Sequence, residues 1–340
     1  MTTTTKAIVI DRYNDNLLRA LTGMRVSETE LEPPAPDEVI VTIDAAPINP
    51  SDIAFIRGGY NIRKPLPATV GFEGTGRVSA TGTACRELDG LRVSFFTQDP
   101  RYGSWAEKIK VKAGHCIRLI DEIPVEQAAC LSINPLTAMG MAEMVVKGKY
   151  STVVLNAAGG QVPSMIRGLL RETGIKIINI VRKEKGISRI GKQPGNSVLC
   201  SSDENFPEQL EKILTDSGPA LFFDAVAGEE AGRIFNLLPP SSRMVMYGGL
   251  SGQPLGAIGL TGIIFKRKTI SGFNLNDWLA AKTPEEWEKT SREVQHKVVD
   301  GTLSTSISEK FPLSKAVDAI RSYIKDMSAG KVLIVPDDSL

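Results

Sequence analysis

The sequence contains few residues that could build a disulfide framework or a metal site. It has only four cysteines and two histidines. They are Cys85, Cys116, Cys130, Cys200, His115 and His296. The cysteines are scattered and form no Cys-x-x-Cys pair, which argues against a disulfide framework and favours reduced thiols. Zinc requires three or four ligands at compatible spacings, and no such set exists, so we expect no metal site.

The sequence also lacks a long apolar run and an excess of charge of either sign. No apolar stretch is long enough to span a bilayer, and the segment from Met1 to Ile10 lacks the apolar core of a secretory signal. The formal net charge is +1, and no dense basic stretch carries interleaved aromatic residues. We therefore expect a cytoplasmic protein that binds neither a membrane nor nucleic acid. A length of 340 residues is enough for two domains.

One stretch of the chain, Ser151 to Arg182, has the pattern of a strand, a small-residue loop, a helix and a second strand. The run from Val153 to Leu155 is typical of a short buried strand. Apolar residues then recur at helical spacing, at Met165, Ile166, Leu169 and Leu170. A second apolar run from Ile175 to Val181 closes the unit. This order predicts the beginning of a dinucleotide-binding βαβ unit.

The loop of this unit consists of residues small enough for a pyrophosphate to approach the backbone. Ala157, Ala158, Gly159 and Gly160 place nothing larger than a methyl group in front of the N–H groups at the helix N-terminus. Pro163 occupies the third small position of the usual fingerprint. There it removes a possible phosphate donor, although a proline fits a first helical turn. For this loop alone, an ordinary strand–turn–helix without a ligand stays an alternative.

A basic pair follows the second strand of the unit. In this fold the adenosine ribose lies at that strand's end, where an acid selects a free 2′-hydroxyl and an arginine accommodates a 2′-phosphate. Arg182 and Lys183 stand there, and Glu184 is the nearest acid. The pair predicts a preference for NADPH over NADH. A solvated basic turn is the alternative interpretation.

The rest of the chain predicts two different architectures. Before the βαβ unit, short strands with frequent turn signals favour a partly open β-barrel. These strands are expected at 6–10, 38–44, 70–78, 90–93 and 103–107. After the unit, alternating strand and helix patterns favour a doubly wound parallel sheet whose last strand lies near Lys268 to Phe273. An exposed helix from Pro284 to Val299 and a strand–helix–strand tail over 307–335 are expected to return to the barrel.

Several short motifs, in their order, resemble one protein family over most of the chain. They are Ile48-Asn49-Pro50-Ser51-Asp52, Gly59-Tyr60, Gly71-Phe72-Glu73-Gly74, Asn134-Pro135-Leu136-Thr137-Ala138, Tyr247-Gly248-Gly249 and Gly330-Lys331-Val332. The chain resembles the zinc-free medium-chain dehydrogenase/reductase family, and most closely its 2-enoyl thioester reductases, with the quinone oxidoreductases next. The resemblance implies an α/β protein with a GroES-like, partly open β-barrel catalytic domain (residues 1–122 and 274–340). It also implies a Rossmann-type dinucleotide-binding domain (residues 123–273).

The resemblance also implies roles for individual residues. Tyr60 corresponds to the proton donor of the enoyl reductases, and Asn49 to a residue that positions the reacting group or the nicotinamide. The implied NADPH contacts are Asn134, Thr137, Ala158, Gly159, Gly160, Gln161, Val162, Arg182, Lys183, Tyr247, Gly248, Gly249, Phe273, Asn274, Leu275 and Lys331. The chain departs from the pattern at Pro163, at Asn196 in place of an alanine, and at Asn274 in place of a tryptophan.

The chemistry of such a reductase needs a proton donor. A hydride delivered to the β-carbon of an enoyl thioester leaves an enolate, and a tyrosine with an ordinary pKa of about 10 can protonate it. Without the family, Tyr60 is equally a packed aromatic residue, and Asn49 and Asp52 are equally helix caps.

Three functions stay open from the sequence: NADPH-dependent reduction of an activated C=C bond, quinone reduction, and nucleotide binding without catalysis, which Pro163 favours. Family members are often dimers, so we expect a homodimer with its interface near an edge strand at Ile264 to Phe273.

Overall fold

The computed structural model describes residues 3–191 and 195–339, and its contacts divide the chain into two compact units. Unit 1 comprises Met1–Pro135 and Lys289–Leu340, and unit 2 comprises Leu136–Glu288. The domain boundaries expected from the sequence, 122/123 and 273/274, both lie earlier in the chain than these. Residues 1–2, 192–194 and 340 of the expected domains lie outside the described part. The first boundary lies later because helix α3 (Val125–Ala129) packs on strands of unit 1.

Unit 2 contains a parallel sheet. Its strands are β9 (Thr152–Leu155), β10 (Lys176–Val181), β11 (Asn196–Cys200), β12 (Ala220–Asp224), β13 (Arg243–Met246) and β14 (Thr269–Gly272). Over residues 136–191 and 195–288 they lie in the order β11-β10-β9-β12-β13-β14, with parallel neighbours throughout. This is the strand order of the dinucleotide-binding doubly wound fold, so that prediction is confirmed. The order reverses between β9 and β12, which places the loop after β9 where such sheets bind ligands.

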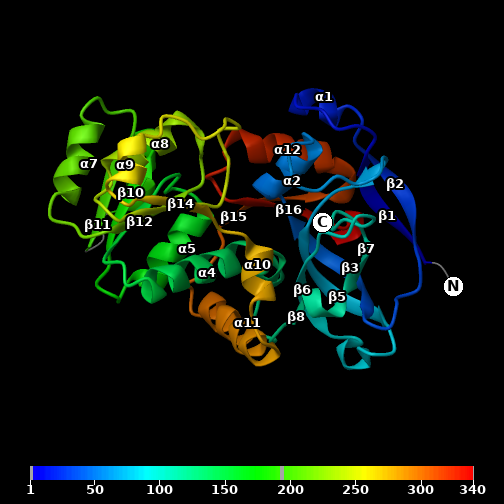
Figure 1. Cartoon of the computed structure of the whole chain (residues 1–340). Helices are drawn as coiled ribbons and strands as arrows, with labels where there is room; N and C mark the ends of the chain where they lie inside the picture. The colour runs from blue at the N-terminus through cyan, green and yellow to red at the C-terminus, as the bar shows by residue number, and fades with distance from the viewer. Residues whose placement is uncertain (1–2, 192–194, 340) are drawn as a thin grey trace. The chain divides into compact units, whose positions relative to one another are not determined.

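Helices cover both faces of this sheet. They are α4 (Asn134–Lys147), α5 (Gln161–Leu170), α6 (Lys185–Ile190), α7 (Phe206–Leu214), α8 (Gly228–Leu237), α9 (Leu260–Ile264) and α10 (Leu275–Ala280). α7 and α8 lie on one face, and α4 and α5 on the other (Figure 1). Leu210 of α7 and Ile234 of α8 join Val154 and Phe222 of the strands in one buried cluster. Alternate residues of each central strand thus serve opposite layers of helices.

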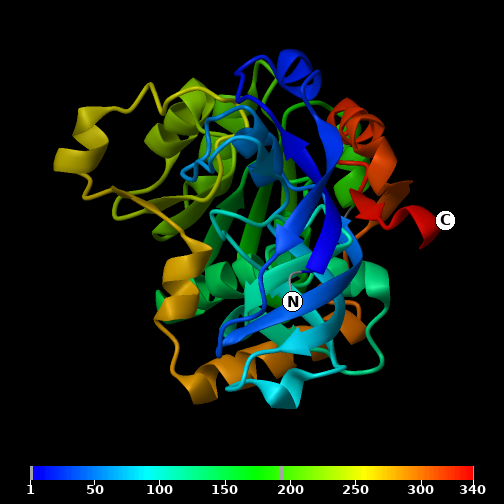
Figure 2. The same ribbon diagram turned by 90° about the vertical axis from the view of Figure 1, so that its right-hand side faces the viewer.

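Unit 1 is built mainly from strands. They are β1 (Thr3–Ile10), β2 (Arg25–Leu31), β3 (Glu38–Pro47), β4 (Ala68–Thr69), β5 (Glu73–Thr81), β6 (Arg92–Phe96), β7 (Lys108–Lys112), β8 (Cys116–Arg118), β15 (Ile307–Pro312) and β16 (Lys331–Val335). β1 lies between β2 and β4, and β1 and β2 run side by side (dark blue in Figure 2). The other strands follow the order β15-β16-β3-β5-β6-β8, with β7 also paired to β3. This arrangement agrees with the GroES-like barrel expected from the sequence.

The helices of unit 1 are short except for α11. They are α1 (Leu17–Leu21), α2 (Pro50–Ile56), α3, α11 (Pro284–Val299), which begins in unit 2, and α12 (Ala316–Lys325). Ala319 and Ile320 of α12 pack in one buried cluster with Ile8 of β1 and Phe55 of α2. The final strand, β16, lies between β15 and β3. The tail of the chain is therefore part of the core of unit 1. In the part of the chain that the structure describes, no helix has both the length and the apolar character of a membrane span.

Two strands expected from the sequence are wrong in position. Residues 103–107 form a loop with one isolated bridge between Ala106 and Ala7, and the strand follows as β7. The side chain of Trp105 in this loop is buried and donates through Nε1 to the Pro47 carbonyl (3.2 Å). The expected edge strand at Ile264 to Phe273 is the end of helix α9 followed by the shorter β14. Apolar residues alone did not distinguish helix from strand in this short segment.

Gly76 lies where the backbones of β3 and β5 approach each other closely. The register of this pair shifts between Ile43 and Ala45, opposite Gly76 and Thr75. A Cβ on Gly76 would lie 2.0 Å from the Thr42 carbonyl oxygen. Gly76→Ala should therefore lower the free energy of unfolding by about 2–3 kcal/mol, measured by urea denaturation. Gly114→Ala, where a Cβ would meet no atom within 4 Å, is the control and should change little; an equal loss in both variants would contradict this account.

Candidate active site

Most of the NADPH contacts expected in unit 2 directly follow the carboxyl ends of its strands. Residues 157–162 follow β9, Arg182 and Lys183 follow β10, residues 247–249 follow β13, and residues 273–275 follow β14. Because neighbouring strands are parallel, these segments meet at one edge of the sheet. The structure thus brings together the cofactor residues expected in unit 2, with two exceptions: Thr137 is buried in the first turn of α4, and Ala158 is fully buried with its N–H and its carbonyl both bonded inside unit 2.

The loop after β9 leaves the start of α5 open. The N-cap of this helix is Gly160, which has no side chain that could cap it. A Cβ on Gly159 would meet no atom within 4 Å, so the space beside this backbone is free. The first N–H groups of a helix have no partner inside the helix, and its dipole favours an anion there. The residues therefore fit the pyrophosphate of a dinucleotide.

Pro163 does not disturb this helix. It is the third residue of α5 and is buried. Its missing N–H would have no partner inside the helix, because the first bond of the i to i−4 kind runs from the Ser164 N–H to the Gly160 carbonyl (3.2 Å). The helix then continues regularly to Leu170. The feature that favoured a non-catalytic protein thus costs α5 no hydrogen bond.

A buried polar pair, which the sequence analysis did not select, braces the ends of β9 and β12. The Asn156 side chain donates through Nδ2 to Oδ1 of Asp224 and accepts through Oδ1 from the Ala225 N–H (2.8 Å). The Asp224 carboxylate also accepts from the N–H groups of Val226 (3.1 Å) and Ala227 (2.9 Å). The two loops at the switch point are therefore tied together. An asparagine directly before the small residues was the only sequence signal for this brace.

The other strand-end residues of unit 2 differ in exposure. Arg182 and Lys183 are exposed, as a contact to a ligand phosphate requires. Tyr247 is half-buried, whereas Gly248 and Gly249 are exposed. A Cβ on Gly248 would lie 2.8 Å from the Ala225 carbonyl oxygen, so the loops after β12 and β13 approach closely there.

After β14, Phe273 and Leu275 are half-buried. The exposed Asn274 caps α10 by accepting a hydrogen bond from the Asn276 N–H (2.8 Å). Asn274 therefore serves the local helix at the position where the resemblance implies a tryptophan.

Tyr60 of unit 1 lies in the segment after α2 and is half-buried. Its hydroxyl accepts a hydrogen bond from Nε2 of Gln98 (3.2 Å), and its ring packs on the buried Phe72 at 5.3 Å between centroids. Burial raises the pKa of Tyr60, the charge of Asp52 raises it further, and the Gln98 hydrogen bond lowers it. The phenol is therefore protonated at neutral pH, as a proton donor must be.

The segment that carries Tyr60 is anchored by Lys64. The Tyr13 hydroxyl accepts from the Lys64 N–H (2.8 Å) and donates to the Lys64 carbonyl (2.9 Å). The buried Lys64 ammonium donates to the Tyr102 carbonyl and lies over the rings of Phe55 and Phe72. Burial lowers the pKa of Lys64 to about 8. This anchor fixes the chain only four residues beyond Tyr60, and no sequence pattern indicated it.

Asn49 belongs to a fully buried polar cluster in unit 1. Its Nδ2 donates to Oε2 of Glu73 (2.9 Å), and its Oδ1 accepts from Nζ of Lys331. Lys331 also donates to the Ile48 carbonyl (3.2 Å), and Glu73 accepts from the Ile133 N–H (2.7 Å). The cluster joins the beginning of α2, β5 and the last strand, β16. Both polar atoms of the Asn49 side chain, and the ammonium group of Lys331, are thus bonded inside unit 1.

Asp52 completes this cluster. One carboxylate oxygen accepts from the Asn49 N–H (2.7 Å), whereas the other, Oδ1, is buried without a hydrogen-bond partner among the described residues. Burial raises the pKa of Asp52 to about 7 and the pKa of Glu73 to about 7, while the nearby Lys331 ammonium opposes both shifts. With two acids and one cation, the cluster holds its protons at a pH where exposed carboxylates are ionised.

Asn134, the remaining expected contact, is half-buried and begins α4 at the end of unit 1. Thr137 lies one turn later on the same helix, so the two side chains project from one face of it. No cluster of three or more His, Cys, Asp or Glu side chains suited to a metal ion occurs over 3–191 and 195–339.

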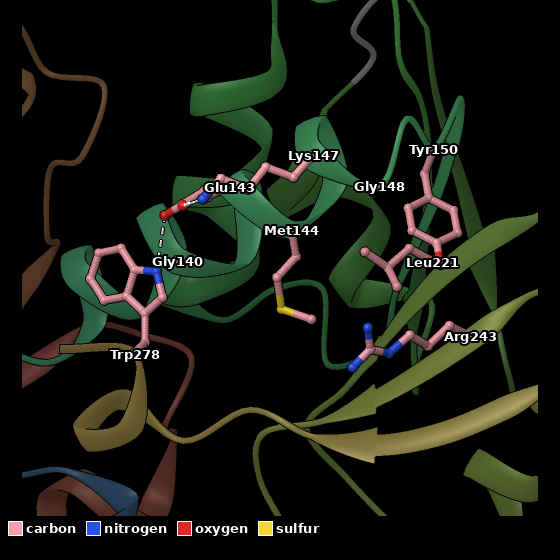
Figure 3. A pocket seen from close by; sticks show the side chains of 9 residues that line it. All are labelled: Gly140, Glu143, Met144, Lys147, Gly148, Tyr150, Leu221, Arg243 and Trp278. Atoms are coloured by element: carbon pink, nitrogen blue, oxygen red, sulfur yellow. Dashed lines mark hydrogen bonds and ion pairs between the residues drawn. The ribbon is translucent and has the colours of Figure 1, made fainter. Parts of the chain in front are cut away.

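A hollow of about 430 Å³ lies elsewhere in unit 2. It is lined by Gly140, Glu143, Met144, Lys147, Gly148, Tyr150, Leu221, Arg243 and Trp278. Figure 3 shows Met144 of α4 and Arg243 of β13 pointing into it. Arg243 is the first residue of β13, so this part of the hollow lies at the amino ends of the strands. Another lining residue, Gly140, lies against Phe273, since a Cβ on Gly140 would be 2.7 Å from Cζ of Phe273.

Comparison with known proteins decides the family. Residues 35–121 match the model of the alcohol dehydrogenase GroES-like domain. The mitochondrial enoyl-[acyl-carrier-protein] reductase of Arabidopsis thaliana is 32% identical over 289 residues, which cover 82% of this chain and 74% of that protein. The chain belongs to the zinc-free medium-chain dehydrogenase/reductase family.

Solved structures agree with this family. The putative NADPH:quinone reductase of Mesorhizobium loti is 30% identical, with a TM-score of 0.89 over 98% of both chains. The complex of Etr1p with NADP and crotonyl-CoA is 22% identical, with a TM-score of 0.78 over 98% of this chain and 100% of that one, and shows the fold alone. The zinc-free medium-chain fold predicted from the sequence is thereby confirmed.

The buried acids should make stability depend on pH. The folded pKa of Asp52, about 7, lies above its ordinary value of 3.8, so the folded state holds this proton more tightly and loses stability as pH rises between these values. Asp52→Asn removes the part of this pH dependence that comes from Asp52, while the part that comes from Glu73, whose pKa is also raised to about 7, remains. One pKa unit corresponds to about 1.4 kcal/mol, and the new buried amide opposes part of the gain.

We therefore expect Asp52→Asn to be more stable than the wild type by about 1–3 kcal/mol at pH 8, and by less at pH 5, in urea denaturation. Asp89→Asn changes an exposed carboxylate of unit 1 and is the control. An unchanged pH profile in Asp52→Asn would show that this carboxyl group is ionised in the folded protein.

Proposed function

We propose that this protein is an NADPH-dependent oxidoreductase that reduces an activated C=C bond, in a 2-enoyl thioester or an enone. The observation that carries the proposal is the open N-terminus of α5 beneath a small-residue loop, with Arg182 exposed at the end of the neighbouring strand. The relatives agree, since the Arabidopsis protein is an enoyl reductase by name.

In this proposal unit 2 is the dinucleotide-binding domain and unit 1 the catalytic domain. The N–H groups of Gly159, Gln161 and Val162 would hold the pyrophosphate, whereas the Gly160 N–H donates to the Ala157 carbonyl (2.9 Å). Arg182 with Lys183 would hold the 2′-phosphate. Asn134, Thr137 and the segments 247–249 and 273–275 would line the nicotinamide side. The bound cofactor would supply the hydride. A solved neighbour of this fold holds NADP, which supports the choice of cofactor.

Tyr60 would supply the proton. Its raised pKa keeps the phenol protonated at neutral pH, and the Gln98 amide gives the hydroxyl one fixed partner. Because that amide donates, the hydroxyl hydrogen stays free to point at a substrate. Asn49 and Lys331 have their polar groups bonded inside unit 1, so we assign them to positioning the segment 48–52 and not to direct contact.

The proton donor can be tested by removing one oxygen atom. Tyr60→Phe should lower kcat for crotonyl thioester reduction about 100-fold or more, because general acid catalysis supplies factors of this size. The Kd for NADPH, from a fluorescence titration, should not change. Tyr150→Phe alters a tyrosine that precedes the amino end of β9, away from the carboxyl ends of the strands, and should leave both constants unchanged. Equal loss of turnover and NADPH affinity in Tyr60→Phe would remove this residue from the mechanism.

Quinone reduction is the second candidate. The 30% identity to a putative NADPH:quinone reductase over 98% of the chain favours it. Quinone reduction needs a hydride but no strict proton donor, so Tyr60→Phe would keep most of that activity. Comparing kcat/KM for crotonyl thioester and for a simple quinone, in wild type and in Tyr60→Phe, separates the two candidates.

We also propose that the protein is a homodimer. Leu260, Ile264 and Phe265, in and after α9, are 70%, 62% and 77% exposed, and they lead to the edge strand β14. Two copies of such an edge can pair antiparallel across a two-fold axis and cover these side chains.

Phe265→Glu should therefore shift the protein from dimer to monomer in sedimentation velocity. Leu18→Glu, at a leucine of unit 1 that is 64% exposed, is the control and should not change the mass. A wild-type monomer at micromolar concentration would refute the dimer.

We propose the cytoplasm as the compartment. The four cysteines are free and buried, which suits a reducing environment. The Arabidopsis relative is mitochondrial by name, so cell fractionation with a mitochondrial marker is the appropriate test.

A further inference from the structure

Arg167 is a buried cation on the helix that follows the small-residue loop. It lies in α5 and is 8% exposed. Its side chain runs back toward the beginning of the helix, as long side chains on helices do. Nη1 donates to the Ala158 carbonyl (2.8 Å) and to Oδ1 of Asn179 on β10 (3.0 Å). The guanidinium therefore lies directly beneath the loop.

The charge of Arg167 has no acidic partner. Both of its hydrogen-bond acceptors are neutral, and in residues 3–191 and 195–339 no carboxylate forms an ion pair with it. Burial lowers the pKa of Arg167 to about 10, so the side chain still carries its charge at neutral pH. Arginines this buried are almost always paired with an anion.

The loop above the guanidinium is held from within unit 2. The Ala158 N–H donates to the Ile180 carbonyl of β10 (3.1 Å), and its carbonyl accepts from Arg167. Both backbone groups of Ala158 are thus turned into the unit. The next residues, from Gly159 onward, lead to the open start of α5. An anion bound there would lie one peptide unit from a buried positive charge.

We propose that the missing counter-ion of Arg167 is the pyrophosphate of the bound dinucleotide, and that this positioning residue offsets the N–H that Pro163 lacks. The inference rests on the proposed function. Arg167 would act through the electrostatic attraction between its guanidinium and the pyrophosphate, and through its hydrogen bond, which fixes the orientation of the Ala158 peptide. The pyrophosphate is common to NADPH and NADH, so the contribution of Arg167 must be equal for both. Arg182 would distinguish them.

A purely structural role is the competing explanation. Arg167 joins α5 to β10 through Asn179, whose Nδ2 donates to the Ser197 carbonyl (3.2 Å), and a neutral donor could serve that purpose equally well. Arg167→Gln keeps an amide donor and removes the charge. Arg167→Lys keeps the charge and loses the planar fork. The two variants therefore separate charge from hydrogen bonding.

The experiment is a fluorescence titration of NADPH and NADH with the full-length protein. Arg167→Gln should raise the Kd of both cofactors about tenfold or more, by the same factor within error. Arg182→Gln should raise the Kd of NADPH and leave that of NADH nearly unchanged. Arg171→Gln, an exposed arginine at the end of the same helix, is the matched control and should change neither.

Thermal melting provides a readout that does not depend on turnover. Without cofactor, Arg167→Gln should melt at or above the wild-type temperature, because a buried unpaired charge is lost. With saturating NADPH its increase in Tm should be smaller than that of the wild type. A purely structural role predicts that NADPH raises the Tm of Arg167→Gln by as much as it raises that of the wild type, whatever the Tm without cofactor.

The outcomes separate the inference from the function on which it rests. No saturable binding of either cofactor by the wild type would overturn the proposed function. Wild-type binding with an unchanged Kd in Arg167→Gln would overturn only the role of Arg167. If Arg167→Gln does not fold, Arg167→Lys decides: a Kd within about threefold of the wild type supports the charge, and a tenfold loss overturns it.

Discussion

The parallel pairing of β9 with β10 on one side and β12 on the other is the constraint on which the candidate cofactor site depends. Because β9 lies where the strand order reverses, its carboxyl end opens between two loops that leave in opposite directions. The hydrogen bond from Asn156 to Asp224 ties the loops after β9 and β12 together, and Arg167 binds the Ala158 carbonyl in the loop after β9. Small residues in the loop are then a consequence, since the backbone itself must meet the ligand.

The sequence predicted the organisation of unit 2 closely, because its strands and helices each show a characteristic spacing of apolar residues. The runs at Val153 to Leu155 and at Ile175 to Val181 are mainly apolar, and they are found as β9 and β10. Even Pro163, the departure from the usual loop, was correctly placed in a first helical turn. Strong local patterns and a single dominant fold supported the same answer.

Unit 1 and the polar interior could be predicted much less well. β2 has few buried residues, and the segment from Gly103 to Glu107 is buried without being a strand, so alternation of apolar residues identified neither. Lys331 binds Ile48 and Asn49, which are 283 and 282 residues away from it in the sequence. No local pattern reports which buried acid meets which buried base, and the same holds for Lys64 and Arg167.

The position of β16 between β15 and β3 has a consequence for how the chain is made. Residues 136–288 form their own sheet and core and can collapse while synthesis is still in progress. The strands near the N-terminus cannot complete their sheet until residues 331–335 arrive to pair with Pro47 and Ala46. Pairing across so long a loop is slow. A nascent chain can therefore contain a folded unit 2 while the sheet of unit 1 still has unpaired strand edges. Unpaired edges favour aggregation, so this is the stage at which a chaperone would be needed most.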